Sequence, residues 1–190
     1  NTLNLLMRTA YREGAPQTAD LICDLADLLR RAYYYKDSIC TLAEEMQCAR
    51  QYLTLQSQRL GPGFSFEVGD VSACGQLMIP VLTIQPLVEN ALLHRILHCD
   101  RKDMRLTIRS WRADGEAVIQ IEDNGCGMEE AKAKRLQNAQ IEPGSSYGVA
   151  NVRKRLELFE KEKGEFLVES RIGAGTCITI KIQEPGNKEL

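Results

Sequence analysis

The first 60 residues carry apolar side chains at intervals of three and four, the repeat of an amphipathic α-helix. One such stripe consists of Leu21, Ile22, Leu25, Leu28, Leu29 and Ala32. Pro16 stands where a first-turn proline would begin this helix. The pattern predicts either two long helices packed antiparallel or one broken helix packed against a partner.

A second apolar stripe begins after Asp37-Ser38 and consists of Leu42, Met46, Ala49 and Leu53. Thr41 and Glu44 have the spacing of a capping box, in which each side chain accepts a hydrogen bond from the other residue's backbone N–H. We therefore expect a new helix to begin at Leu42.

Gly61-Pro62-Gly63 ends the helical pattern, and beyond it the apolar period changes towards two. We expect the main domain boundary here. The predicted organisation is a helical region over residues 1–60, a second domain over 64–183 and a short tail over 184–190.

Alternating apolar and polar residues predict two β-hairpins in the second domain. The first alternates on both sides of a tight turn at Asp114-Gly115, and the second spans 166–183 around a Gly-rich turn at 173–175. Helices are expected over 86–97, 128–138 and 149–162. Strands joined by hairpins and interrupted by helices indicate an α+β layer sandwich.

Composition narrows the possible classes of protein. The chain has 190 residues, of which 44% are hydrophobic and 26% charged, so it can bury a core. Its net charge of −2 provides no overall positive field, and we expect no nucleic-acid partner. Its longest apolar runs fall short of the about 18 residues that a membrane span needs.

The seven cysteines are scattered and contain no Cys-x-x-Cys pair. This pattern argues against a disulfide framework and a zinc ribbon, and it is typical of a protein from reduced cytosol. His94, His98 and Cys99 stand at helical spacing, but the sequence offers no evident fourth ligand for a zinc site.

The first cluster of candidate binding or catalytic residues lies in 85–94, Gln-Pro-Leu-Val-Glu-Asn-Ala-Leu-Leu-His. On a helix, Asn90 and His94 share one face, with Glu89 beside them. Mg²⁺ prefers oxygen ligands and takes few from the protein, so one Asn90 oxygen suffices. Glu89 is placed to orient or deprotonate an attacking group. The alternative is that these polar residues only face solvent.

The second cluster is Asp123-Asn124-Gly125-Cys126-Gly127, directly after a predicted strand. Glycines there allow close approach of a ligand to the backbone, and the Asp123 carboxylate can accept a hydrogen bond from an adenine amino group. The same Asp-Asn-Gly sequence also forms ordinary turns. This cluster alone leaves both interpretations open.

The third cluster is the Gly/Ser segment 144–151, which leads into a helix with Arg153, Lys154 and Arg155. Such a loop at a helix N-terminus points backbone N–H groups at an anion, which favours phosphate. The alternative for the three basic residues is a solvated helix face.

In their order along the chain, these segments resemble the LytS-like (YehU-type) sensor histidine kinases, whose catalytic domain belongs to the GHKL ATPases with gyrase and MutL. The N box is matched by Ile79-Pro80 and residues 85–91, the G1 box by 123–127, the G2 region by Gly148, Asn151-Val152 and Arg155-Leu156, and the final glycine motif by Gly173, Gly175 and Thr176. The dimerisation helices are matched by Leu28-Leu29-Arg30, Leu42, Glu44-Glu45, Tyr52-Leu53 and Arg59.

The resemblance implies roles at the phosphate end of an ATP site. Asn90 would hold Mg²⁺ on the ATP phosphates, and Glu89 would act as the base or the orienting acid. His94 would lie near the phosphates. Gly148 and Asn151 would close this end of the site.

At the adenine end, the resemblance implies that Asp123 binds the adenine amino group. Gly125 and Gly127 would shape that wall, and Thr176 would contribute from the final glycine motif. Residues 128–147 would form a lid over the bound nucleotide, a segment longer than an ordinary connection.

The implied fold is α+β, a helical hairpin that is a truncated dimerisation region, followed by an α/β layer sandwich of the GHKL (Bergerat) ATPase type. The implied activity is transfer of the ATP γ-phosphate to a histidine and then to a response regulator. The intact protein would be a homodimer, with this part a cytoplasmic domain attached to a membrane sensor region.

The acceptor histidine of the family lies in a Pro-His-Phe-Leu-Phe-Asn-type segment, and Asn1-Thr2-Leu3-Asn4 resembles the residues directly after that segment. Neither His94 nor His98 matches the acceptor. We therefore expect the acceptor just before residue 1, and no autophosphorylation of this chain at the family's site.

Three positions depart from the family pattern. Leu93 replaces a basic residue, Arg95 replaces a glycine and Ser146 replaces the first glycine of the G2 pair. These departures motivate an alternative, a degenerate nucleotide-binding signalling module without kinase activity. A purely structural dimerisation domain would explain residues 1–60 but not the three clusters.

Overall fold

The computed structural model describes residues 2–16, 18–19, 22, 39–92, 102–138, 147–160 and 164–183. The chain divides into two units, residues 1–38 and 39–190. In the first unit, α1 spans Thr2–Arg12; the Leu5, Leu6 and Tyr11 side chains are exposed, and Ala10 is buried. The apolar stripe predicted over 21–32 lies outside the described residues, except for Ile22.

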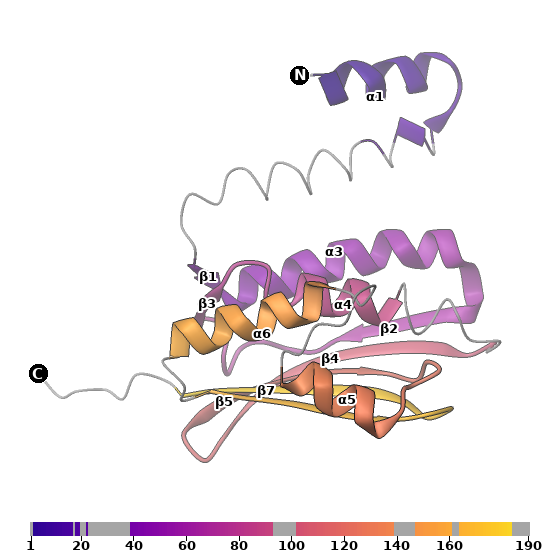
Figure 1. Cartoon of the computed structure of the whole chain (residues 1–190). Coiled ribbons are helices and arrows are strands. Elements are labelled where there is room, and N and C mark those ends of the chain that lie inside the picture. Colours follow the sequence, from indigo (N-terminus) through magenta and orange to yellow (C-terminus); the bar gives the residue numbers. More distant parts are fainter. Residues whose placement is uncertain are drawn as a thin grey trace, which may run out of the picture. The chain divides into compact units, whose positions relative to one another are not determined.

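The second unit is a five-stranded sheet with helices packed on it. Its elements are β1 (Ile39–Thr41), α3 (Leu42–Leu60), a 3-10 turn (Gly61–Gly63), β2 (Phe64–Val68), β3 (Met78–Pro80), α4 (Gln85–Ala91), β4 (Met104–Ala113), β5 (Glu116–Asp123), α5 (Glu130–Gln137), α6 (Tyr147–Glu160), β6 (Glu165–Arg171) and β7 (Gly175–Gln183). The strand order is β2-β4-β5-β7-β6, and β1 pairs separately with β3. Figure 1 shows α3, α4 and α6 on one side of the sheet. The predicted α+β layered class is confirmed.

Helix α3 begins where the capping box predicts. The Thr41 backbone N donates to Glu44 Oε2 at 2.8 Å, and the Glu44 backbone N donates to Thr41 Oγ1 at 3.3 Å. The first of these hydrogen bonds lowers the pKa of Glu44. The predicted stripe of Leu42, Met46, Ala49 and Leu53 is buried, so the amphipathic assignment is confirmed.

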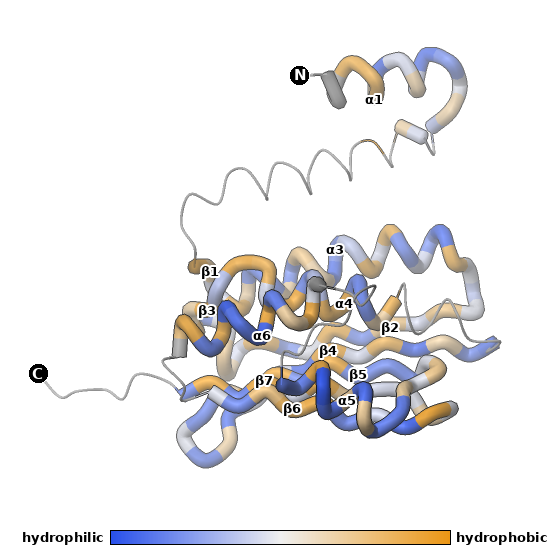
Figure 2. Tube along the Cα trace, viewed as in Figure 1, coloured by the Kyte–Doolittle hydropathy of each residue, from blue (hydrophilic) through white to orange (hydrophobic). Residues whose placement is uncertain are grey.

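Both predicted hairpins are present, β4 with β5 and β6 with β7. Asp114 and Gly115 form the first turn with φ of 53° and 81°, the left-handed backbone that such a turn requires. Buried apolar residues then line up across the sheet, as in the row Ile108, Ile121, Ile178 and Val168. Figure 2 shows hydrophobic residues recurring along these strands, with hydrophilic ones between them.

Two pairings differ from the expectation of hairpin links alone. Strand β2 pairs in parallel with β4, through a crossover that includes α4. Strands β1 and β3 form a separate antiparallel pair. Each of these has only three residues, and this is too short for an alternating pattern to stand out from the sequence.

The helices that flank the hairpins start and end close to their predicted bounds. Within the predicted ranges 128–138 and 149–162 lie α5 (Glu130–Gln137) and most of α6 (Tyr147–Glu160). Of the helix predicted over 86–97, the structure describes α4 and the following residue, Leu92. Residues 93–101 lie outside the described part of the chain. The tail 184–190 also lies outside them, and the division into domains 1–60 and 64–183 stays a prediction. No helix in the described part is long and apolar enough to cross a membrane.

Candidate functional site

One end of the sheet carries a polar row, which is formed by Asp123, Thr176 and Ser170. In that row, Asp123 of β5 lies between Leu106 of β4 and Thr176 of β7, and Thr176 pairs with Ser170 of β6. Because side chains alternate along a strand, Asp123 is on the same face as Ile121, two residues earlier. Asp123 and Thr176 are 5% and 3% exposed. The sheet therefore buries a carboxylate and a hydroxyl beside its core.

Asp123 is held by the loop that it begins. Its Oδ1 accepts a hydrogen bond from the Gly125 backbone N at 2.9 Å. A carboxylate can accept several hydrogen bonds on its two oxygens. The position fits a ligand with an N–H donor, such as an adenine amino group.

Two glycines let this loop and the β6–β7 turn come into backbone contact. Gly127 has φ +62°, and a Cβ there would lie 1.9 Å from the Arg171 carbonyl oxygen. Gly175 has φ +102°, and its Cβ would lie 2.0 Å from the Asp123 carbonyl oxygen. Side chains at these positions are excluded by sterics as well as by the backbone conformation.

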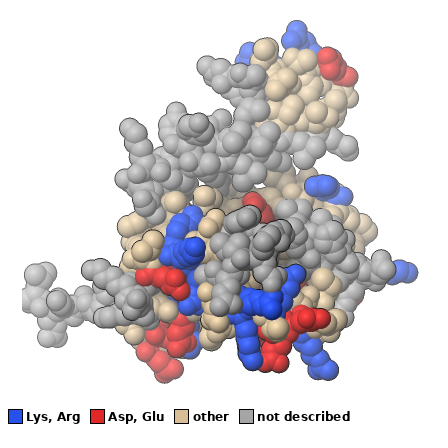
Figure 3. Space-filling view, in the orientation of Figure 1, with Lys and Arg blue, Asp and Glu red and all other residues tan. Residues whose placement is uncertain are grey.

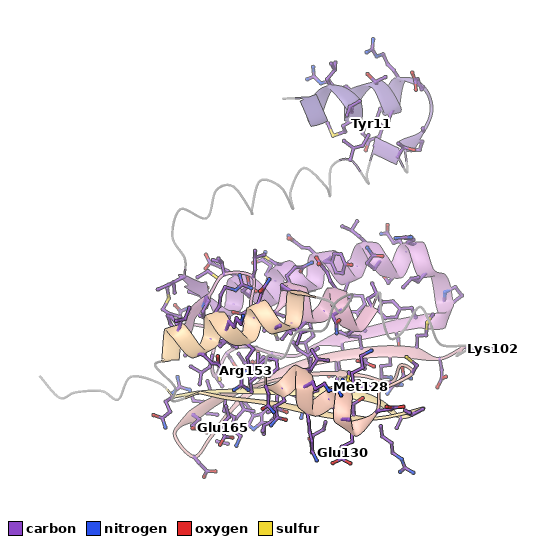
Figure 4. All side chains as sticks on the ribbon, in the orientation of Figure 1. Tyr11, Lys102, Met128, Glu130, Arg153 and Glu165 are labelled. Carbon is purple, nitrogen blue, oxygen red and sulfur yellow. The ribbon has the colours of Figure 1, made fainter. Side chains whose placement is uncertain are left out.

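The sequence reasoning missed Ser170, which joins three parts of this end of the sheet. Its Oγ accepts from the Met128 backbone N at 2.9 Å, donates to the Gly175 carbonyl at 2.9 Å and lies 2.8 Å from Thr176 Oγ1. Met128, labelled in Figure 4, begins the segment that leads to α5. A serine in an alternating strand gave no signal of this role.

Asn124 anchors the loop on its other side. The Arg105 backbone N donates to Asn124 Oδ1 at 2.7 Å, and Asn124 Nδ2 donates to the Asp103 carbonyl at 2.6 Å. The loop after β5 is thus fixed to the start of β4 on one side and to the β6–β7 turn on the other. The structure places Asp123, Gly125, Gly127 and Thr176 close together at this end of the sheet.

Helix α4 carries the first cluster. Asn90 is 8% exposed and Glu89 is half-buried. Gln85 Nε2 donates to Glu89 Oε1 at 2.9 Å. Burial, and then the Glu89 carboxylate, raise the pKa of Tyr52 on α3 to about 12. The Glu89 carboxylate therefore lies near α3, and Asn90, the next residue of α4, is more buried.

The start of α6 lies against the start of α4. A Cβ on Gly148 would be 3.5 Å from the Pro86 Cβ, an ordinary contact distance. Asn151, one turn later, is exposed. Gly148 therefore lies beside the helix that carries Asn90, whereas Asn151 faces outward.

The three basic residues of α6 have different surroundings. Arg153 donates to the Phe166 carbonyl at 3.2 Å, its guanidinium lies 5.8 Å from the Phe166 ring centroid, and Figure 4 shows it above the sheet near Glu165. Arg155 donates to backbone carbonyls before α4. Lys154 is exposed. Only Lys154 matches the expectation of a solvated helix face.

Charges of both signs lie side by side on the face seen in Figure 3. The surface ion pairs include Glu130–Lys134 at 2.6 Å and Glu165–Lys181 at 2.7 Å. Such exposed pairs contribute little to stability because water screens them.

His94, His98, Cys99, Leu93 and Arg95 lie outside the described residues, as do Ser146 and positions 139–146 of the predicted lid. Within the described ranges, no group of three or more His, Cys, Asp and Glu side chains is arranged to hold a metal ion. A magnesium ion carried on phosphates needs no such group, and the Asn90 amide oxygen is of the type that Mg²⁺ accepts.

Comparison with known sequences gives matches over nearly the whole chain. The profile of the family described as histidine kinase-, DNA gyrase B-, and HSP90-like ATPase matches residues 78–186, and that of histidine kinases matches residues 1–64. Sensor histidine kinase YesM of Bacillus subtilis is 30% identical over 96% of this chain and 30% of its own length. Sensor histidine kinase YpdA of Escherichia coli is 31% identical over 96% of this chain and 31% of its own length.

Sensor protein LytS of Staphylococcus haemolyticus is 27% identical over 82% of this chain and 26% of its own length. The chain thus spans less than a third of the length of these three relatives.

Solved structures share the fold at lower sequence identity. The histidine kinase domain of the blue-light activated histidine kinase from Erythrobacter litoralis has a TM-score of 0.56 at 19% identity, over 95% of this chain and 82% of that one. The nucleotide-free catalytic domain of histidine kinase ThkA has a TM-score of 0.54 at 15% identity, over 76% of this chain and 93% of that one.

Proposed function

Because this chain belongs to the family of histidine kinase-, DNA gyrase B- and HSP90-like ATPases, we propose that its second unit binds Mg·ATP as the catalytic part of a sensor histidine kinase. In this proposal the ATP γ-phosphate passes to a histidine of the intact kinase and from there to a response regulator. Such a transfer depends on positioning and charge neutralisation more than on covalent chemistry by the protein.

The observation that carries the proposal is the polar row at the end of the sheet. Asp123 is a buried carboxylate, and Gly127 and Gly175 bring the loop after it into backbone contact with the β6–β7 turn. In the proposed complex Asp123 accepts a hydrogen bond from the adenine amino group. Gly125 and Gly127 form the wall beside the ring, and Thr176 contributes its buried hydroxyl.

At the phosphate end we assign Asn90 as the protein ligand of Mg²⁺, with His94 near the phosphates. The ion would supply positive charge against the phosphate oxygens. Gly148 and Asn151 close this end from α6. Glu89 keeps the predicted role of base or orienting acid, and Gln85 fixes one of its carboxylate oxygens.

The wider assembly is also part of the proposal. The histidine-kinase profile over residues 1–64 supports a dimerisation role for the helical region, and hence a homodimer in the intact protein. The word sensor in the names of the relatives supports attachment to a sensor region, and we place this part at the cytoplasmic side of a membrane. Residues 128–147 would close over the nucleotide as a lid.

Calorimetric titration with Mg·ATP tests the nucleotide site. We expect saturable binding and a raised melting temperature for the wild-type chain, and at least about a tenfold loss of affinity in Asp123→Asn. Glu122→Gln is the matched control, because Glu122 is the exposed neighbour on the same strand. Absence of wild-type binding, or equal affinities for wild type and Asp123→Asn, would refute the proposal.

A further inference from the structure

The segment between β3 and α4, residues 81–84, has an unusual backbone. Leu82 has φ +57°, a left-handed conformation that is uncommon for a residue with a branched, bulky side chain. Ile84 precedes the first turn of α4 and gives it no side-chain cap. The conformation of this segment therefore depends on contacts from elsewhere in the fold.

One set of contacts comes from α3. Glu45 is 3% exposed, yet it carries a carboxylate in the apolar stripe of the helix. Its Oε1 accepts from the Leu82 backbone N at 2.9 Å, and its Oε2 accepts from the Ile84 backbone N at 2.8 Å. Both carboxylate oxygens are thus used to bind the entry of α4, in charge-assisted hydrogen bonds.

The Cys40 thiol also faces this carboxylate, with its Sγ 3.9 Å from Glu45 Oε1. Burial and the neighbouring carboxylate raise the pKa of Cys40 to about 12. The thiol therefore stays protonated near neutral pH and adds no second negative charge beside Glu45.

The opposite set of contacts comes from α6. Arg155 Nη1 donates to the Val81 carbonyl at 3.0 Å, and Nη2 donates to the Leu82 carbonyl at 2.5 Å. Burial lowers the pKa of Arg155, while the Glu45 carboxylate raises it. The acid of α3 and the base of α6 thus bind the N–H groups and the carbonyls of the same short segment.

The start of α3 is joined to the chain that leads into this segment. The Leu42 backbone N donates to the Leu77 carbonyl at 2.8 Å, and the Ala43 backbone N donates to the Gly75 carbonyl at 3.0 Å. Strand β1, directly before α3, pairs with β3, directly before residue 81. The first turns of α3 and the entry of α4 are therefore parts of one hydrogen-bonded body.

We propose that Glu45 and Arg155 are positioning residues that clamp residues 81–84 from two sides and so set the placement of Asn90 on α4. The clamp is defined by these two side chains and residues 81–84. Its role in placing Asn90 rests on the proposed function of the nucleotide site. It couples α3, within the range matched by the histidine-kinase profile, to the phosphate end of that site.

Hydrogen exchange without nucleotide tests the clamp itself. In Glu45→Gln we expect the Leu82 and Ile84 amides to exchange at least about tenfold faster, since one acceptor is replaced by a donor. Glu44→Gln is the matched control. Glu44 is exposed on the same turn, and glutamine keeps its place in the capping box. Unchanged exchange in Glu45→Gln would overturn the clamp.

Ligand binding separates positioning from general stabilisation. In Glu45→Gln we expect Mg·ATP to bind about tenfold more weakly, while adenosine, which reaches only the Asp123 end, changes by less than about twofold. Equal losses for both ligands would overturn the positioning role.

Arg155→Lys keeps the charge but not the two-pronged donor, and it is measured in the same way. We expect it to weaken Mg·ATP binding and to leave adenosine binding nearly unchanged. The test therefore does not depend on the folding of one variant. If the wild-type chain binds neither ligand, the proposed function fails. The exchange measurement then still decides whether Glu45 and Arg155 hold the entry of α4.

Discussion

The two ends of the proposed nucleotide site are built differently. At the Asp123 end, backbone touches backbone, since a Cβ on Gly127 or Gly175 would lie 1.9 or 2.0 Å from a carbonyl oxygen. At the Asn90 end, two helix starts meet through side chains, and a Cβ on Gly148 would lie 3.5 Å from Pro86. The first end is fixed by the hydrogen bonds of the sheet, whereas the second depends on how α4 and α6 are held.

The two ends differ in which of their parts can move. Sheet register determines the Asp123 end, and a shift of one residue would move its side chains to the other face. The Asn90 end can move as α4 moves, because the entry of α4 is held by Glu45 and Arg155 rather than by a sheet. Substitutions at the Asp123 end should therefore cost more stability than substitutions at the Asn90 end.

The largest effect is expected from Gly175→Ala. The added Cβ meets the Asp123 carbonyl at 2.0 Å on a backbone with φ +102°, so we expect a loss of about 3 kcal/mol or more in the free energy of unfolding. Gly173→Ala is the control in the same turn, because its φ is +77° but its Cβ would meet nothing within 4 Å; about 1 kcal/mol is expected. Urea denaturation measures both losses, and equal values would show that the backbone contact of Gly175 adds no rigidity to the Asp123 end.

The second effect concerns the Asn90 end alone. In Asn90→Ala we expect affinity for Mg·ATP to fall about tenfold, or about 1.4 kcal/mol, with adenosine binding unchanged. Removal of Mg²⁺ with EDTA should bring the wild-type affinity for ATP down to that of the variant. Calorimetry checks both. A variant that still responds fully to Mg²⁺ would show that Asn90 is not its ligand.

The smallest effect is expected from Gly148→Ala. The contact with Pro86 at 3.5 Å leaves room for a methyl group, and alanine favours a helix over glycine by about 1 kcal/mol. The free energy of unfolding should therefore stay the same or rise by up to about 1 kcal/mol, as measured by urea denaturation. A loss comparable with that of Gly175→Ala would show that both ends are equally rigid.

Local signals made much of the fold predictable from the sequence. The capping box of Thr41 and Glu44 gives the start of α3, and Asp114-Gly115 gives the first hairpin, because both act over a few residues. The parallel pairing of β2 with β4 was not predictable in this way. Its partners Phe64 and Met104 are 40 residues apart, and neither strand's pattern specifies the other.

The same distinction applies to the site. Asp123, Gly125 and Gly127 form one contiguous motif, and the structure keeps them together. Ser170 joins them only through strand register, so its role was invisible in the sequence. Glu45 did leave a signal, a carboxylate within a buried apolar stripe. The binding and catalytic roles of all the site residues stay predictions, those of Asp123, Gly125, Gly127 and Thr176 as much as those of Asn90, Glu89, His94, Gly148 and Asn151.

Helix α5 also covers part of one border of the sheet. Strand β6 is at the border of the sheet, and its Val168 N–H donates to Gln137 Oε1 of α5 at 3.1 Å. A border strand with free N–H groups is a template for pairing with another chain. Because α5 lies within the predicted lid, any state in which it leaves β6 uncovers that template. Bound nucleotide that keeps α5 in place would thus also protect the protein against aggregation.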